Sequence, residues 1–226
     1  MGFVVESLRR IAAKILGRDG SEYDTNVDRS GDVVIRTDSA AEKMENASLE
    51  LHHNDWVSLK HMSCPKNKIF NYVYSTETRC DGKIAAFIPF KKVGLNVELL
   101  VRCEATPCWN YNEQVPSSFT GAVEKGETPL ETVIHELKEE AGYAVDSKNI
   151  INLGQVFGSK SSDTIYFLFG VDLGDSGTPD TLTCESELEK SSYNVWIPLK
   201  DAFEISDSMF NCVAFRLLHY LNMVKV

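Results

Sequence analysis

Apolar residues gather in short runs through the middle of the chain, at the lengths and spacings of β-strands. Residues 56–59 and 69–74 alternate between apolar and polar positions, which is typical of half-buried strands. Two longer runs, KIAAFIPF at 83–90 and VELLVRC at 97–103, are separated by a turn that contains Gly94 and Asn96. Three further strands are expected at 150–157, 164–171 and 193–197.

A loop and two helices complete the pattern. The stretch leading to Gly121 predicts a loop that holds Pro107, Trp109, Tyr111 and Pro116. Thr128-Pro129-Leu130-Glu131 has the form of a capping box, and a stripe of apolar residues at helical spacing follows it as far as Gly142: Leu130, Val133, Ile134, Leu137 and Ala141. A closing helix is expected over residues 207–224. This order of elements predicts an α/β sandwich around a mixed β-sheet.

The N-terminal fifth of the chain differs from the rest. Residues 1–18 predict a short amphipathic helix, and residues 19–46 are polar and rich in Asp, Ser and Gly. We therefore expect an N-terminal helix and polar arm over residues 1–50, followed by one larger domain with an N-terminal strand region over residues 51–226.

Composition narrows the class of protein. The 226 residues are 43% hydrophobic and 25% charged, which excludes a collagen, a coiled coil and a wholly disordered chain. A net charge of −10 argues against binding duplex nucleic acid. The sequence contains no apolar run of membrane-spanning length, and its six cysteines form no C-x-x-C pair. We expect free thiols and a cytoplasmic location; organelle targeting by the basic N-terminal helix is the weaker alternative.

Three carboxylates lie beside the apolar stripe of the first helix. Glu136, Glu139 and Glu140 occupy positions i, i+3 and i+4, so they share one helix face. A solvated acidic face is the simplest interpretation of this pattern. The functional interpretation is that the three carboxylates converge on hard divalent cations, which prefer oxygen ligands.

The whole segment from Gly121 to Tyr143 resembles the Nudix box, G-x5-E-x7-R-E-U-x-E-E-x-G-U, in which U is a bulky apolar residue. Gly121, Glu127, Glu136, Glu139, Glu140 and Gly142 occupy its fixed positions, and His135 stands where the family usually has arginine. The resemblance implies a Nudix-type α/β/α sandwich and the hydrolysis of a nucleoside diphosphate linked to another moiety. It also implies Mg²⁺, with Mn²⁺ as the alternative ion.

The resemblance assigns roles within the box. It implies that Glu136, Glu139 and Glu140 hold the metal together with the Gly121 carbonyl, that Glu136 is the first candidate for the general base, and that Glu127 anchors the loop. Many members add an acid from a distant loop, and the acidic segment with Glu185, Glu187 and Glu189 stands in the corresponding place, with Glu187 favoured.

From Trp56 onward the chain is most similar to the ADP-ribose and ADP-sugar pyrophosphatase branch. That branch implies a small nucleoside diphosphate substrate and a homodimer that exchanges its N-terminal strands. The chain departs from the branch by reading SSFTG at 117–121 in place of E-x-P-A-G. An aromatic platform and a cation would suit such a substrate, and the candidates for these roles are Trp56, Trp109, Phe119 and Arg102.

Two other functions stay open from the sequence alone. The same chemistry can act on a nucleoside triphosphate, a dinucleotide or an RNA 5′ end. Alternatively, the chain is a nucleotide-sensing module without catalysis. The complete set of box glutamates favours an enzyme, and we therefore expect a Mg²⁺-dependent pyrophosphatase that converts ADP-ribose or another nucleotide sugar to a nucleoside monophosphate and a sugar phosphate.

Overall fold

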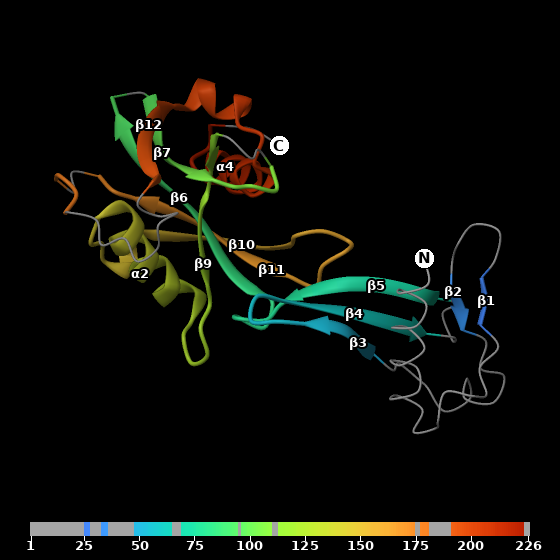
Figure 1. The fold of residues 1–226 in the computed structure, drawn as a ribbon. Helices are drawn as coiled ribbons and strands as arrows, with labels where there is room; N and C mark the ends of the chain where they lie inside the picture. The colour runs from blue at the N-terminus through green and yellow to red at the C-terminus, as the bar shows by residue number, and fades with distance from the viewer. Residues whose placement is uncertain are drawn as a thin grey trace. The chain divides into compact units, whose positions relative to one another are not determined.

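The computed structural model describes residues 25–27, 33–35, 48–64, 69–94, 96–109, 113–174, 177–180 and 191–223. The expected helix over residues 1–18 and most of the acidic segment at 172–190 lie outside these residues. The strands, labelled in Figure 1, are β1 (Thr25–Val27), β2 (Val33–Ile35), β3 (Ser48–His53), β4 (Val57–Cys64), β5 (Ile69–Glu77), β6 (Lys83–Val93), β7 (Asn96–Ala105), β8 (Gln114–Ser117), β9 (Phe119–Ala122), β10 (Ile150–Phe157), β11 (Ile165–Asp172) and β12 (Tyr193–Pro198). The helices are α2 (Pro129–Ala141) and α4 (Ser208–Tyr220), with 3-10 turns η3 (Ser147–Asn149) and η4 (Leu199–Glu204).

The chain divides into two compact units, one made of residues 1–53 and 58–74 and the other of residues 54–57 and 75–226. In the first unit β3, β4 and β5 form a three-stranded sheet, in which β3 and β4 are antiparallel. The short strands β1 and β2 form a separate antiparallel pair. Among the described residues, no helix is long and apolar enough to cross a membrane.

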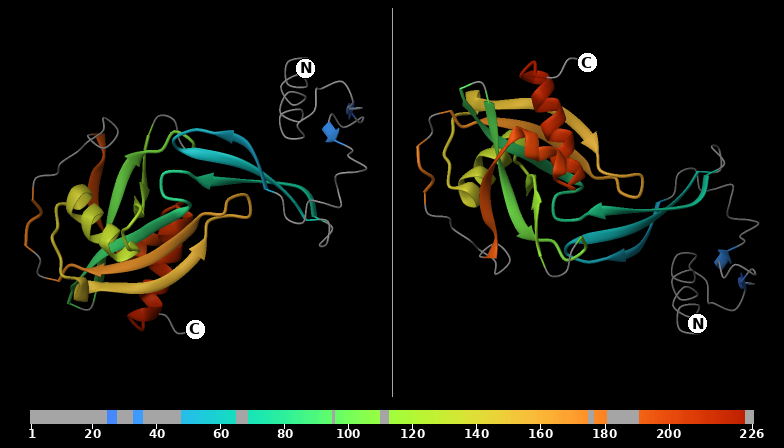
Figure 2. Two further views of the ribbon diagram at one scale, coloured as in Figure 1. Left: turned by 90° about the horizontal axis from the view of Figure 1, so that it is seen from below. Right: turned by 90° about the horizontal axis from the view of Figure 1, so that it is seen from above.

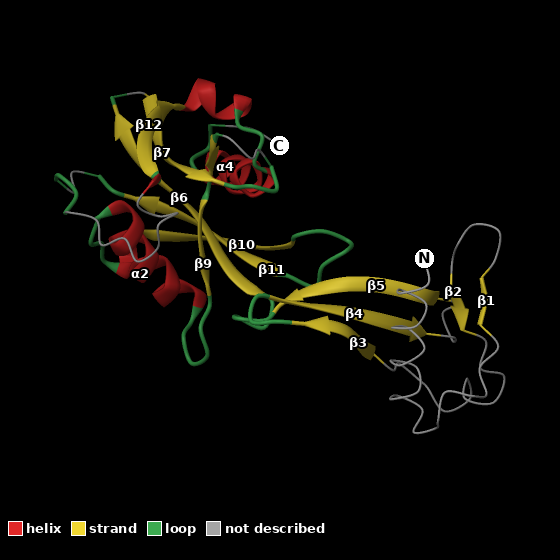
Figure 3. Ribbon diagram, in the orientation of Figure 1, coloured by secondary structure: helices red, strands yellow, loops and turns green. Residues whose placement is uncertain are grey.

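The second unit is built on a seven-stranded sheet with the order β10-β11-β6-β7-β12, to which β8 and β9 are added by pairing with β7 and β6 (Figure 3). The β11–β6 pair is parallel, whereas β10–β11, β6–β7 and β12–β7 are antiparallel. The prediction of a mixed sheet is therefore confirmed.

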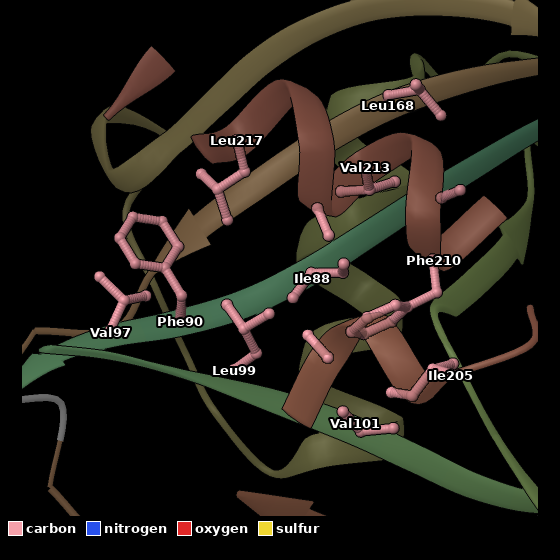
Figure 4. Close-up of a cluster of buried hydrophobic side chains, with 13 residues drawn as sticks. Ile88, Phe90, Val97, Leu99, Val101, Leu168, Ile205, Phe210, Val213 and Leu217 are labelled. Atoms are coloured by element: carbon pink, nitrogen blue, oxygen red, sulfur yellow. The ribbon is translucent and has the colours of Figure 1, made fainter. Parts of the chain in front are cut away.

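Each face of this sheet carries one helix, so the predicted α/β/α sandwich is also confirmed (Figure 2). Successive residues of β6 point to opposite faces because strands have a side-chain period of two. Ile88 and Phe90 pack with Phe210, Val213 and Leu217 of α4 in one core (Figure 4). The other core joins the alternate residues of β6 to α2; its fully buried members are Ala85, Phe87, Phe119, Val133, Leu137 and Val171.

The segment before Gly121 differs from the expected loop. It contains β8, which pairs with β7, and β9, which pairs with β6. The prolines of this segment predicted a loop, but proline is also tolerated in short strands at the edge of a sheet. Pro116 lies in β8 opposite Cys103. Since β6 pairs with β7 at 90–93 and with β9 at 84–87, the sheet forks and brings Gly121 opposite Ala85.

Candidate active site

Helix α2 carries the three acidic residues, and both of its ends are fixed. The Thr128 side chain accepts a hydrogen bond from the Glu131 backbone N–H, and the Glu131 carboxylate accepts one from the Thr128 N–H at 2.7 Å. That backbone donor and the Thr128 hydroxyl hold the pKa of Glu131 below its usual range. At the other end Gly142 adopts the left-handed conformation with φ 73°. The predicted capping box and C-terminal glycine are confirmed.

Gly121 lies directly against Glu136. A Cβ atom at position 121 would stand 2.4 Å from Cγ and 2.5 Å from Oε1 of Glu136, closer than two such atoms can approach. Only glycine leaves this space on β9. The carboxylate of Glu136 therefore lies over the backbone of Gly121, although the two residues are fifteen positions apart in the sequence.

Glu140 points toward the sheet. Its side chain is 17% exposed, and its Oε1 lies 3.2 Å from Nη2 of Arg102, a β7 residue whose side chain is only 3% exposed. A buried guanidinium is costly unless it is paired, so each group stabilises the charge of the other. Glu139, one position earlier, is exposed to solvent.

Glu127 holds the loop that precedes the helix. Its Oε1 lies 2.8 Å from Nδ1 of His135, and its Oε2 accepts a hydrogen bond from the Thr132 hydroxyl at 3.1 Å. Glu127 therefore ties the loop to the first two turns of α2 from two sides. His135 forms this contact at the position where the Nudix box, which this segment resembles, usually has arginine.

The sequence model of the NUDIX domain family matches residues 96–214, more than half of the chain. The chain belongs to the Nudix family. A crystal structure described as that of an ADP compounds hydrolase has a similar fold, with a TM-score of 0.57 and 14% sequence identity. That match covers 80% of this chain and 96% of the other. At this identity the likeness shows the fold alone. No curated protein matches the sequence.

Family membership makes this chain a Nudix hydrolase, an enzyme that cleaves phosphoanhydride bonds. The Nudix box spans β9, the following loop and α2. The fold thus brings the Gly121 backbone and Glu136 together, with Glu139 and Glu140 on the same turn of the helix. The Glu127 carboxylate contacts His135 and Thr132.

The ligand types of this group fit a divalent ion. Carboxylate and carbonyl oxygens are the donors that Mg²⁺ prefers, and Mg²⁺ commonly uses one or two carboxylates together with waters and substrate phosphates. Among the described residues, no three His, Cys, Asp or Glu side chains form a preformed metal cluster. Glu140 pairs with Arg102 as its counter-ion.

The four candidates for substrate contact have different surroundings. Trp56 is 61% exposed and the guanidinium of Arg79 lies 4.3 Å from its ring centroid, while Trp109 is 54% exposed. Phe119 is fully buried and stacks on Phe87, with ring centroids 5.3 Å apart. The expectation of a substrate contact at Phe119 is therefore corrected, because its ring packs in the core. Arg102 is also buried.

The candidate acids of the distant loop, Glu185, Glu187 and Glu189, lie outside the described residues.

Sequence reasoning missed Asp207, which joins α4 to the site. Its buried carboxylate caps α4 by accepting hydrogen bonds from the N–H groups of Met209 and Phe210. It also accepts from the Ser118 N–H at 2.9 Å and the Ser118 hydroxyl at 2.8 Å. Asp207 thereby fixes the residues that lead into β9 and Gly121. An Asp before a helical run signals a cap, but nothing local signals the contact with Ser118.

Proposed function

We propose that this Nudix hydrolase cleaves the diphosphate of ADP-ribose or another nucleotide sugar in the presence of Mg²⁺, giving a nucleoside monophosphate and a sugar phosphate. The similar fold of the ADP compounds hydrolase supports an adenosine diphosphate substrate. Trp56 and Trp109 are exposed aromatic residues available to stack on a nucleobase. Glu187 is proposed as a further acid of the site.

The observation that carries the proposal is the contact of Glu136 with Gly121. It brings Gly121, the first residue of the Nudix box, against the Glu136 side chain of α2, which lies on the same helix turn as Glu139 and Glu140. These oxygen donors would hold the ion. When bound, Mg²⁺ would neutralise diphosphate charge and make a bound water more acidic.

The residues then divide the work of hydrolysis. Glu136 is the proposed general base: one of its oxygens accepts a proton as the water oxygen bonds to phosphorus. The bridging P–O bond breaks, and its electron pair leaves on the phosphate of the departing half. Because there is little covalent chemistry for the protein in such a reaction, its main task is to position charged groups. The contacts of α2 with β9 and β7 serve this task.

The contact between His135 and Glu127 supports catalysis over nucleotide sensing. In this chain His135 still bonds the loop glutamate, at 2.8 Å, despite the missing arginine. The substitution therefore leaves the loop anchored, and the box residues Glu136, Glu139 and Glu140 are all present. A module that had lost catalysis would be expected to show damage among those residues.

The substrate is tested by phosphate release with Mg²⁺, using a coupled phosphatase, across ADP-ribose, other nucleotide sugars, dinucleotides, NADH and dNTPs. We expect the highest kcat/KM for ADP-ribose or another nucleotide sugar, and AMP as a product from ADP-ribose. A preference for dNTPs or dinucleotides would refute the substrate assignment while leaving the hydrolase reaction intact.

We also propose that the protein is a homodimer. The strands of the first unit carry exposed apolar side chains, namely Leu59, Tyr72 and Val73, which a partner chain can cover. Sedimentation velocity at micromolar concentration should give twice the mass of one chain. Replacing Tyr72 and Val73 with Ser should shift the measured mass toward that of the monomer. A wild-type protein that sediments with the mass of one chain would refute the proposal.

A cytoplasmic location is proposed from the thiols. Cys80, Cys103, Cys108 and Cys212 are free, and free thiols are usual in a reducing compartment. Burial raises the pKa of Cys80 and Cys103, which makes these two thiols less reactive. Fractionation of cells that express the full chain is the direct check.

A further inference from the structure

The guanidinium of Arg102 is buried and contacts other groups of the protein. Arg102 is 2% exposed, and the neighbouring β7 residues Leu99, Leu100 and Val101 belong to the two hydrophobic cores. Its Nε donates a hydrogen bond to Glu104 at 3.0 Å, and its Nη1 donates to the main-chain oxygen of Glu140 at 3.4 Å. Together with the ion pair to the Glu140 carboxylate, these contacts use all three guanidinium nitrogens.

A second residue reaches the same point on the helix. Asn194 of β12 is directly opposite Arg102 of β7 in the sheet register, so both side chains leave the same face. The Asn194 amide donates to the main-chain oxygen of Glu140 at 2.6 Å. The last four carbonyl groups of a helix have no partner within it, and Glu140 supplies one of these four in α2. Two adjacent strands thus bind the end of α2.

We propose that Arg102, assisted by Asn194, is a positioning residue that sets the orientation of the Glu140 carboxylate for the divalent ion. The inference rests on the proposed function, because it takes Glu140 as a metal ligand. Arg102 binds this residue at both its carboxylate and its main-chain oxygen, which fixes the side chain at two points. Partners behind metal ligands commonly act in this way. Its burial and the contact that each of its three nitrogens makes within the protein favour this role for Arg102 over direct contact with the substrate.

The test compares Arg102→Lys with Arg216→Lys. Lysine keeps the positive charge but lacks the planar fork that bonds three oxygens at once, so the electrostatic effect on a bound cation is retained and only the orientation is lost. Arg216 of α4 donates to the Leu153 main-chain oxygen at 2.8 Å, and α4 packs on the opposite face of the sheet from α2. It is therefore a matched control for the loss of an arginine contact.

The first readout is Mn²⁺ binding to the full-length, substrate-free protein, measured by calorimetry or by electron paramagnetic resonance. We expect R102K to weaken Mn²⁺ binding about tenfold and R216K to change it by less than about twofold. In hydrolysis at saturating Mg²⁺, R102K should lower kcat while the KM for the nucleotide sugar stays within about twofold of the wild type. A raised KM with unchanged Mn²⁺ affinity would overturn the inference and make Arg102 a substrate ligand.

Two further variants complete the test. In an E140Q background, R102K should cause no additional loss of Mn²⁺ affinity, because the group that Arg102 positions is already changed. Additive losses would overturn the inference. If R102K fails to fold, the test is made with N194S, which should also weaken Mn²⁺ binding. Wild-type Mn²⁺ affinity in N194S would refute the proposal. A wild-type protein that binds no Mn²⁺ would overturn both the proposed function and this inference, whereas Mn²⁺ binding without nucleotide-sugar hydrolysis would overturn the substrate assignment alone.

Discussion

Gly121→Ala separates the geometry of the site from the stability of the fold. The new Cβ would meet three atoms of Glu136, at 2.4, 2.5 and 2.7 Å, so this side chain must move. Glu136 is only partly buried and its side chain is flexible, so it can move without a change in the backbone. We therefore expect a stability loss of about 1 kcal/mol, the low end of the range for overpacking, and a fall in Tm of about 2–4 °C.

The loss of activity should be far larger. A displacement of about 1 Å in a catalytic group can cost about 10²-fold in rate, so we expect kcat for the nucleotide sugar to fall by about that factor. The assay is coupled phosphate release, with circular dichroism to confirm folding. Thr120→Ala, an exposed neighbour on the same strand, is the control and should keep wild-type kcat. A folded G121A enzyme with wild-type kcat would refute the claim that Glu136 acts from its position over Gly121.

Three stability predictions follow from the caps. Thr128→Ala should cost about 1 kcal/mol in urea unfolding, since it removes the side-chain cap of α2. The pKa of Glu131 is lowered in the folded state, so this carboxylate stabilises the fold above its ordinary pKa of 4.5, and that stabilisation is lost as the pH falls through the lowered pKa. In an acid titration, T128A should therefore lose less free energy of unfolding over this pH range than the wild type. Gly142→Ala should cost about 2 kcal/mol, because it combines a φ of 73° with a Cβ only 2.5 Å from a facing carbonyl oxygen. Asp207→Ala should lower the free energy of unfolding by about 3 kcal/mol, as it removes the α4 cap and the bonds to Ser118. Unchanged urea midpoints would contradict each.

Local patterns made much of the fold predictable. The capping box at Thr128, the apolar stripe of α2 and the terminal Gly142 act within one helix, so the sequence alone contains their signals. The apolar runs at 83–90 and 97–103 predicted β6 and β7 for the same reason. The acidic face of α2 was predictable because i, i+3 and i+4 share a face in any helix.

The contacts that join distant segments were not predictable. Arg102 and Glu140 are 38 positions apart, and their ion pair depends on the side of the sheet that α2 covers. Asn194 reaches the same helix end through the register between β7 and β12, which no local pattern fixes. Phe119 looked like a stacking residue, but β9 pairs with β6 and places the ring in the core.

The central claim is that carboxylates of α2 carry out metal-dependent cleavage of a nucleotide sugar. The most direct measurement is kcat with ADP-ribose and Mg²⁺ for the double variant E136Q/E139Q, which leaves the ion pair between Glu140 and Arg102 in place. Its control is D201N/E204Q, which removes the same charge from exposed residues of η4. The account predicts a loss of about 10³-fold in the first variant and a kcat within about twofold of the wild type in the control. A folded E136Q/E139Q enzyme that retains wild-type turnover would contradict it.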